Sequence, residues 1–573
     1  MVKFLVGVAT GIALVLLSFL LLIVIALQFR EKPPAIADHS VLVMRLEGEL
    51  PEKPPVELPN FLGGDHAPAT VPSVWSMLDK AAVDPHIQAV VVEPMGVQAG
   101  WAKLEELRLD LERFRKSGKP VFAYLRQPGA REYVLSAGAD RVWIGPSDPM
   151  MLKGLRAELM YFKNTLDKIG VNVEVEHAGK YKDFGDMFTR AGMSPETREV
   201  MNSVVDDLYG SLVGRIAAGR KKTPEQVREI IDRGPFTASQ ALKEGLVDAL
   251  AFEDQMWGEI KDKLKSGEPN KVSMDKYRKV TLESLGLQGK SRIALVVGQG
   301  DIVRGGPNDD GGEDALTSYG FTKLLRQVRN DSGVKGVVVR IDSGGGEVTA
   351  SDDIWREMNL LSKQKPMVIS MSDAAASGGY YMAMTGDPIV AYPSTITGSI
   401  GVVFGKPNLR GLYDKLGVTK EFVQRGTHAD IDSEYTPLTP AERQLLRVGI
   451  DESYQDFLRK VAGARRKTVA QIESVAQGRV WLGSQARQNG LVDELGGLDK
   501  AVELVKQKAK IPAGERVSIS IYPGRRNFLD IIMKKSQEDA LEARIREVMG
   551  RVPFRAWLHP GFLRTMTYWL DVR

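Results

Sequence analysis

One serine, Ser377, lies between three alanines and two glycines in the stretch "SDAAASGGYY" (372–381) of a 573-residue chain. The chain has no cysteine and only six histidines. The lack of cysteine excludes disulfides, thiolate metal sites and a cysteine nucleophile. A serine hydroxyl is a weak nucleophile at neutral pH and needs a base within hydrogen-bonding reach. If Ser377 is a nucleophile, another side chain must therefore activate it.

The chain contains an internal repeat whose corresponding stretches lie about 247 residues apart. "IQAVVVEP" (87–94) corresponds to "VKGVVVRI" (334–341), and "SQALKEGLVD" (239–248) corresponds to "SQARQNGLVD" (484–493). Other matched stretches follow the same order in both halves. Such self-similarity indicates a duplicated structural unit.

The second half carries a hydroxyl and a glycine run that the first half lacks. Opposite Ser377 the first half has Ala130 or Arg131, depending on where a one-residue gap is placed. The run of three glycines in "IDSGGGEV" (341–348) stands opposite "PMGVQAGW" (94–101). A glycine turn exposes backbone N–H groups, which can stabilise a developing oxyanion.

The first half carries a lysine that the second half lacks. "AGKYKDFGD" (178–186) corresponds to "RGTHADIDS" (425–433), which places Ala429 opposite Lys182. Lysine can act as a general base when burial disfavours its ammonium form and lowers its pKa. Because each half has what the other lacks, we expect one composite site at the interface between the repeats. Ser377 would be its nucleophile and Lys182 its base, as in Ser-Lys hydrolases.

The site also needs oxyanion donors and elements that hold them. Gly378, directly after the serine, and Gly344 in the glycine turn are the candidate donors. "ASGG" before an apolar stretch predicts that Ser377 lies at the start of a helix. Strand-like apolar runs such as Val90–Val92 alternate with amphipathic stretches, which predicts right-handed βαβ units and an α/β fold. In one such stretch, helical spacing places four residues on one face, namely Leu104, Leu107, Leu111 and Phe114.

Composition excludes some functions and favours a membrane anchor. The 77 basic and 73 acidic residues are interspersed, so no broad basic surface predicts nucleic-acid binding. The glycine run lacks the "GK[ST]" of a phosphate-binding loop, which argues against a nucleotide site. Hydrolysis by a serine and a lysine implies no metal or other cofactor, and none is expected. Residues 4–29 contain no charge and are long enough to span a bilayer. "AIA" (35–37) leaves cleavage of this segment open as an alternative, and the flanking charges do not orient it.

The expected domain organisation has five parts. These are an anchor and linker (1–40), a first repeat with the lysine (41–253), a connecting segment (254–290), a second repeat with the serine (291–512) and a helical, aromatic extension (513–573).

Together these features resemble the long form of bacterial signal peptide peptidase A, also called protease IV. The resemblance rests on the anchor, the duplication and the motifs "IDSGGGEVTASD", "AAASGGYY", "TGSIGVVFG" and "YKDFGDMFTRAGMSPETRE". It implies tandem crotonase/Clp-protease-like spirals of ββα units. It also implies the roles assigned above to Ser377, Lys182, Gly344 and Gly378, and adds Ser399 in "TGSIG" as the residue that orients the lysine.

The resemblance further implies a function and a location. The expected activity is endopeptidase cleavage of released signal peptides and other short apolar peptides. The expected assembly is a homotetramer in the bacterial inner membrane, with its catalytic part on the periplasmic side. The C-terminal extension matches no motif of the family.

Three alternatives remain open from the residues. His428 or His177 could serve as the base of a Ser-His-Asp site. A crotonase-like acyl-CoA enzyme could use the glycine turn to stabilise a thioester enolate. A membrane scaffold without catalytic activity would use the repeats only for assembly and binding.

Overall fold

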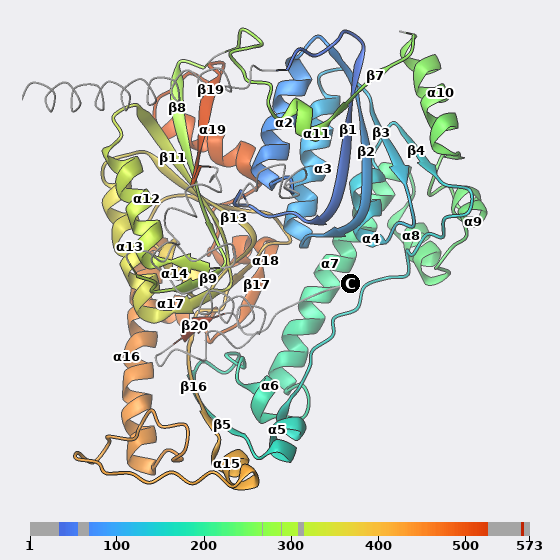
Figure 1. Ribbon diagram of the computed structural model, residues 1–573. Coiled ribbons are helices and arrows are strands. Elements are labelled where there is room, and N and C mark those ends of the chain that lie inside the picture. The colour runs from blue at the N-terminus through green and yellow to red at the C-terminus, as the bar shows by residue number, and fades with distance from the viewer. Residues whose placement is uncertain are drawn as a thin grey trace, which may run out of the picture.

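The computed structural model describes residues 34–54, 68–265, 267–287, 289–306, 315–524 and 563–565. The predicted membrane anchor, residues 4–29, lies outside these ranges, as does most of the predicted C-terminal extension. Within the ranges described, no helix combines the length and the apolar character needed to cross a bilayer. Figure 1 shows two α/β units side by side, the first in blue to green and the second in yellow to red.

The first unit is built on a parallel sheet of six strands. Within this sheet, the strand β2 (Ile87–Gln98) buries Val90, Val91 and Val92 completely, as expected for a parallel strand that is covered on both faces. The strand order is β6-β4-β3-β2-β1-β7. The strands are β1 (Ser40–Glu49), β2 (Ile87–Gln98), β3 (Val121–Leu125), β4 (Arg141–Ile144), β6 (Ala249–Leu250) and β7 (Asn270–Ser273).

The second unit repeats this arrangement on an eight-stranded sheet. Its path is β17-β15-β13-β11-β8-β19, with β14 and β18 beside β13. All pairings are parallel except that of β15 with β17. The strands are β8 (Ser291–Gln299), β11 (Val334–Ser343), β13 (Met367–Ala376), β14 (Ile389–Ala391), β15 (Ile396–Gly398), β17 (Val480–Leu482), β18 (Glu494–Leu495) and β19 (Val517–Tyr522).

The three longest helices of one unit match the three longest of the other in length, which confirms the duplication. The helices of 13, 15 and 26 residues each occur once in both units. In the 15-residue helix of the first unit, the four residues predicted to share one face are all buried. The pairs are α2 (Val71–Val83) and α12 (Ser318–Asn330), α3 (Trp101–Arg115) and α13 (Val348–Ser362), and α7 (Pro195–Arg220) and α16 (Pro440–Arg465).

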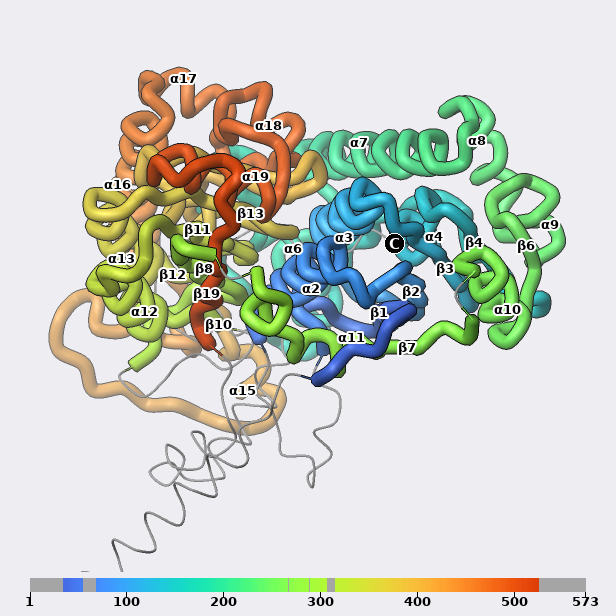
Figure 2. The backbone as a smooth tube through the Cα atoms, turned by 90° about the horizontal axis from the view of Figure 1, so that it is seen from above, coloured from blue at the N-terminus to red at the C-terminus, as the bar shows by residue number. Residues whose placement is uncertain are grey.

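Shorter helices complete both units (Figure 2). In the first unit they are α4 (Ala130–Ser136), α5 (Lys163–Ile169), α6 (Asp186–Thr189), α8 (Pro224–Asp232) and α9 (Ala238–Lys243). In the second unit they are α14 (Gly378–Met382), α15 (Arg410–Leu416), α17 (Val469–Glu473), α18 (Gly483–Asn489) and α19 (Leu498–Lys508).

The segment expected to connect the halves is largely part of the first unit. It contains α10 (Glu253–Leu264), α11 (Met274–Tyr277) and β7, and β7 pairs with β1. The helix α10 buries Met256, Trp257 and Ile260, a short apolar pattern that the lysine-rich composition of the whole segment obscures in the sequence. Likewise β19, in the predicted C-terminal extension, pairs with β8 as a strand of the second sheet.

A third sheet joins the two units. Its order is β10-β9-β12-β20-β16-β5, and β5 (Asn172–Ala178) of the first unit pairs antiparallel with β16 (Val402–Asn408) of the second. The other strands are β9 (Asp301–Val303), β10 (Ala315–Thr317), β12 (Gly345–Glu347) and β20 (Leu563–Thr565). Because β5 lies on the second unit, the turn that follows it, residues 179–185, is carried to the strand ends of the second sheet.

Candidate active site

Ser377 lies at a sharp turn between β13 and α14. Its backbone has φ 53° and ψ −112°, a conformation that non-glycine residues rarely adopt. It is the N-cap residue of α14, as the sequence suggested, although this helix has only five residues. Its N–H donates to the carbonyl oxygen of Gly398 (2.8 Å), and the residue is fully buried. The turn therefore holds Ser377 in one position at the end of the strand.

Lys182 reaches Ser377 from the other unit. Its Nζ lies 2.9 Å from Ser377 Oγ, and both residues are fully buried. It lies in the turn after β5, where its N–H donates to the carbonyl oxygen of Gly179 (3.1 Å). The site is thus composite, with one side chain from each repeat.

Ser399 contacts the same amine. Lys182 Nζ donates to Ser399 Oγ (2.9 Å) and to the Ser399 carbonyl oxygen (3.1 Å). Ser399 also has a positive φ, 51°, and its N–H donates to the carbonyl oxygen of Arg479 (2.7 Å). With Ser377, these contacts surround the amine with three oxygen atoms, which hold it in place.

Two glycines that the sequence analysis did not single out give the lysine its space. A Cβ on Gly478 would lie 2.6 Å from both the N and the Cβ of Lys182, and the φ of Gly478 is +76°. A Cβ on Gly401 would lie 3.1 Å from Lys182 Cδ. Glycines recur throughout the chain, so only the folded arrangement distinguishes these two.

The glycine turn lies beside the start of α14. A Cβ on Gly379 would lie 2.6 Å from the carbonyl oxygen of Ser343, so the two backbones are in close contact. Gly344 follows Ser343, and Gly378 precedes Gly379. Among the described residues, no hydrogen bond uses the N–H of Gly344 or of Gly378. Both N–H groups therefore remain available to an oxyanion near Ser377.

An inter-repeat ion cluster supports both the glycine turn and the serine strand. Lys103 Nζ lies 2.7 Å from Asp342 Oδ2 and 3.6 Å from Asp373 Oδ2. Although burial opposes it, the attraction of these carboxylates raises the pKa of Lys103. Asp373 also accepts the N–H groups at the start of α3, from Gly100 (2.8 Å), Ala102 (3.1 Å) and Lys103 (3.0 Å). The first unit thus contacts the second at two positions, at Asp342 just before the glycine turn and at Asp373 just before Ser377.

The carboxyl next to the lysine is unusual. Burial raises the pKa of Asp183 from 3.8 to about 7, and Asp186 adds to this rise. A hydrogen bond from Thr197 Oγ1 favours the charged form but does not cancel the effect of burial.

The two candidate histidines make other contacts. His428 Nδ1 lies 3.4 Å from Glu442 Oε1, and His177 Nδ1 lies 3.0 Å from the carbonyl oxygen of Gly179. Neither contacts Ser377, whose basic neighbour is Lys182.

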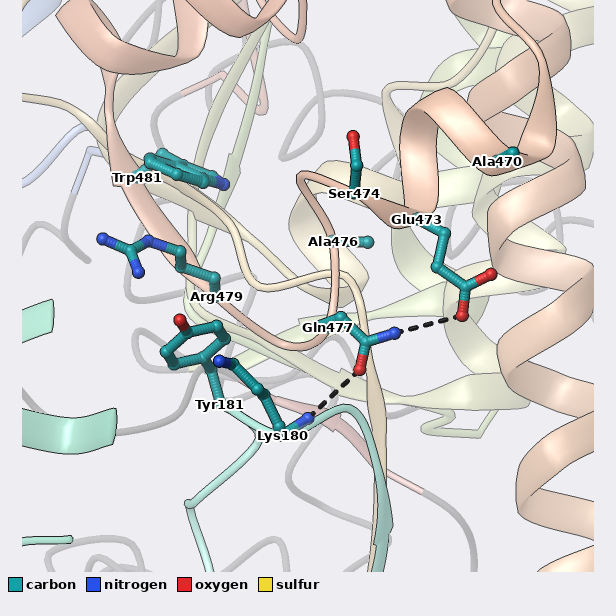
Figure 3. A pocket seen from close by; sticks show the side chains of 9 residues that line it. All are labelled: Lys180, Tyr181, Ala470, Glu473, Ser474, Ala476, Gln477, Arg479 and Trp481. Atoms are coloured by element: carbon teal, nitrogen blue, oxygen red, sulfur yellow. Dashed lines mark hydrogen bonds between the residues drawn. The ribbon is translucent and has the colours of Figure 1, made fainter. Parts of the chain in front are cut away.

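A cavity of about 530 Å³ opens beside the lysine turn (Figure 3). The guanidinium of Arg479 lies over the rings of Tyr181 (5.0 Å) and Trp481 (4.5 Å). Two wall residues of the cavity adjoin residues of the site. Tyr181 precedes Lys182 in the chain, and the carbonyl oxygen of Arg479 accepts the N–H of Ser399. Its walls are Lys180, Tyr181, Ala470, Glu473, Ser474, Ala476, Gln477, Arg479 and Trp481.

The chain is similar in sequence to known peptidases. The pattern of peptidase family S49 matches the chain twice, over residues 113–266 and 359–512. The chloroplastic serine protease SPPA of Arabidopsis thaliana is 35% identical over 84% of this chain and 71% of its own length. Protease 4 of Salmonella typhi is 34% identical over 74% of this chain and 69% of its own length. Protease 4 of Haemophilus influenzae is 30% identical over 86% of this chain and 83% of its own length.

The two matches of the family pattern lie one in each repeat and include the segments that carry Lys182 and Ser377. The chain therefore belongs to peptidase family S49, with the peptidase domain present twice, and is a serine-type peptidase.

Proposed function

We propose that the protein is a membrane-anchored endopeptidase that uses Ser377 and Lys182 as a catalytic dyad. One observation carries the proposal: Lys182 Nζ lies 2.9 Å from Ser377 Oγ, with both residues fully buried. A serine nucleophile requires a base at this distance. Burial also disfavours the charged form of an amine, which is what a lysine base requires.

The reaction would proceed through an acyl-enzyme. Lys182, as the neutral amine, takes the proton of Ser377 while Oγ attacks the scissile carbonyl carbon. The tetrahedral intermediate collapses as the C–N bond breaks, and Lys182 gives the proton to the leaving amine. Water then attacks the ester with Lys182 again as base. This step releases the acid and restores the serine.

Two further groups would assist this reaction. The N–H groups of Gly344 and Gly378 would stabilise the oxyanion of each tetrahedral intermediate. Ser399 would orient the amine of Lys182 toward Ser377, since it holds that amine through both its hydroxyl and its carbonyl oxygen.

The proposed substrates are short apolar peptides, including signal peptides after their release. The cavity beside Lys182 has the rings of Tyr181 and Trp481 in its wall and could accept an apolar side chain. Residues 4–29 would anchor the chain in the inner membrane with the catalytic part on the periplasmic side, and four chains would assemble. The likeness to the Protease 4 sequences supports the peptidase activity in this proposal.

The test is hydrolysis of a quenched apolar signal-peptide substrate by the full chain in detergent. Ser377→Ala and Lys182→Ala should each lower kcat by at least about 10³-fold, with unchanged thermal denaturation. Ser399→Ala should lower kcat less and leave KM nearly unchanged. His428→Ala should retain wild-type activity, because His428 contacts Glu442 and not Ser377.

Other outcomes would point to the alternatives. An active Lys182→Ala protein with an inactive His428→Ala protein would replace the dyad with a histidine base. Failure of Ser377 to react with a serine-directed phosphonate would favour a scaffold. Binding to an immobilised acyl-CoA analogue would favour crotonase-like chemistry.

A further inference from the structure

The sheet that joins the two units has a counterpart that one chain cannot complete. Inside the chain, β5 pairs with β16 from Asn172 opposite Asn408 to Ala178 opposite Val402. Because the chain is duplicated, each of these strands has an equivalent in the other unit. The equivalent of β16 is residues 155–161, and the equivalent of β5 is residues 419–425.

The helices next to these segments define the equivalence. The helices α5 and α15 have seven residues each, and both end at a left-handed glycine, Gly170 and Gly417. The surrounding sequences, "LDKIGV" (166–171) and "YDKLGV" (413–418), are 247 residues apart. The same spacing relates 155–161 to β16 and 419–425 to β5.

Neither equivalent segment belongs to a strand of the described residues. Residues 155–161 alternate between half-buried and exposed, as an edge strand does, and have only a single-residue bridge, at Ala157. Residues 419–425 lie in the loop between α15 and α16, which extends away from the second unit (Figures 1 and 2). In this loop Val423 is 93% exposed and Phe422 is 48% exposed.

Charge complementarity indicates what the two segments bind. On the internal ladder Arg443, in the first turn of α16, pairs with Glu174 and lies 2.8 Å from Glu176. The equivalent arginine is Arg198 in "SPETR" (194–198), and the equivalent of Glu174 is Glu421. Both are exposed, and neither forms an ion pair within the described part of the chain. The two surfaces therefore carry residues of opposite charge, Glu421 on one and Arg198 on the other.

We propose that residues 419–425 of one copy pair antiparallel with residues 155–161 of the next, with Glu421 against Arg198. The register follows the internal ladder, so Val423 lies opposite Ala157, as Glu176 lies opposite Phe404. The contact joins different surfaces of identical chains and is therefore head-to-tail, a type of contact that forms a ring when the rotation between copies closes. In the proposed tetramer the fourth copy would close this ring. This inference names the contact surfaces of the tetramer proposed above, and it rests on that assembly.

The pairing of the neighbouring helices is not part of the proposal. Internally, Gly170 and Gly411 bring α5 and α15 into close contact, and a Cβ on Gly170 would lie 2.4 Å from the backbone of Gly411. Asn164 stands at the position equivalent to Gly411, so a second close contact of this kind has no room.

The absence of cysteine from the chain allows a clean crosslinking test. Full-length Ala157→Cys and Val423→Cys proteins, with different tags, are co-expressed and oxidised in detergent. Opposed residues of an antiparallel pair have Cα atoms about 4.5–5.5 Å apart, within the range for a disulfide. We expect a disulfide-linked dimer that carries both tags, and no linked dimer when either variant is expressed alone.

Two controls accompany this test. Phe422→Cys replaces Val423→Cys and should crosslink poorly with Ala157→Cys, because adjacent strand residues point to opposite faces. A single chain with Phe404→Cys and Glu176→Cys should form the disulfide internally, which shows that this register permits the bond.

Charge reversal tests the ion pair. Glu421→Arg and Arg198→Glu should each weaken assembly about tenfold, measured as the protein concentration at which multi-chain particles dissociate. The protein with both changes should assemble as the wild type does. Thermal denaturation confirms that each variant is folded.

The remaining outcomes separate the proposals. Multi-chain particles without the mixed disulfide would overturn these contact surfaces and leave the tetramer standing. A disulfide between two Ala157→Cys chains would replace the head-to-tail contact with a two-fold one. Single-chain particles at all concentrations would overturn both the surfaces and the tetramer, while the peptidase assay would remain a separate test of the dyad.

Discussion

At the residue scale, the site consists of side chains held by unusual backbone positions. Ser377 and Ser399 both have φ near +50°, which costs about 1–3 kcal/mol for each residue. In these conformations the hydroxyls of both serines lie within hydrogen-bonding distance of the amine of Lys182. Asp183, directly after the lysine, is held in an environment that disfavours its charge.

The pH dependence of stability should reveal Asp183. Because burial raises its pKa from 3.8 to about 7, the folded protein binds more protons there than the unfolded chain does between these values. Stability therefore falls as the pH rises through this window. Asp183→Asn should raise Tm at pH 8, by an amount equivalent to at most about 4 kcal/mol, and change it little at pH 4.

Differential scanning fluorimetry from pH 4 to pH 8 measures this effect. Asp167→Asn is the matched control, because Asp167 is half exposed and pairs with Lys163 on the surface. An equal shift of Tm at pH 4 and pH 8 for Asp183→Asn would contradict the proposed ionisation.

At the element scale, the turn after β5 determines where the lysine lies. The pairing of β5 with β16 carries this turn to the second unit, where the N–H of Tyr181 donates to the carbonyl oxygen of Gln477 (2.8 Å). Gly478 then packs against the Lys182 backbone. The amine position thus depends on two elements of the second unit and not only on its own turn.

A methyl group at Gly478 should displace the lysine. The φ of +76° disfavours any side chain, and the new Cβ would lie 2.8 Å from Lys182 Cα. Displacement of a reacting group by about 1 Å can cost about 100-fold in rate. Gly478→Ala should therefore lower kcat about 100-fold in the peptide assay.

Gly463→Ala in α16 provides the comparison, since a Cβ there meets no atom within 4 Å. It should leave activity unchanged and stabilise the helix by about 0.5–1 kcal/mol. Wild-type kcat in the Gly478→Ala protein would show that the lysine does not need this close contact.

At the scale of the whole molecule, buried charges join the two repeats. Arg340 of β11 lies 2.7 Å from Glu52 and also pairs with Glu106 of α3, and all three are fully buried. Glu106 in turn accepts the N–H of Leu498 (3.0 Å) at the start of α19. Loss of one partner leaves uncompensated charge at the interface between the units.

Arg340→Met should consequently destabilise the protein by about 3–5 kcal/mol. Arg233→Met should cost less than about 1 kcal/mol, because the pair of Arg233 with Glu244 is on the surface. Urea denaturation followed by tryptophan fluorescence measures both. Equal midpoints for the two variants would mean that the buried cluster contributes no more than a surface pair.

Much of the site could be predicted because the chain carries its own internal comparison. The differences between the repeats singled out Ser377 and Lys182 without any knowledge of the fold, and the structure places their side chains 2.9 Å apart. Their catalytic roles remain predictions. The alternation of apolar runs and amphipathic stretches likewise predicted the α/β architecture, since local burial patterns are written in the sequence.

Other features depend on residues that are distant in the sequence but close in the fold. Gly478 and Gly401 lack any signal of their own, and their importance comes from the lysine that packs against them. The lysine-rich segment 254–290 belongs to the first unit because its strand β7 pairs with β1 at the edge of the first sheet.

The sequence by itself therefore determined the duplication, the fold class and the two side chains that could do chemistry. Only the tertiary structure decided how the halves meet, through β5 on β16 and through the buried charges around Arg340. The physical reason is that periodicity and residue type report local burial, whereas strand pairing and ion pairing between units depend on long-range geometry.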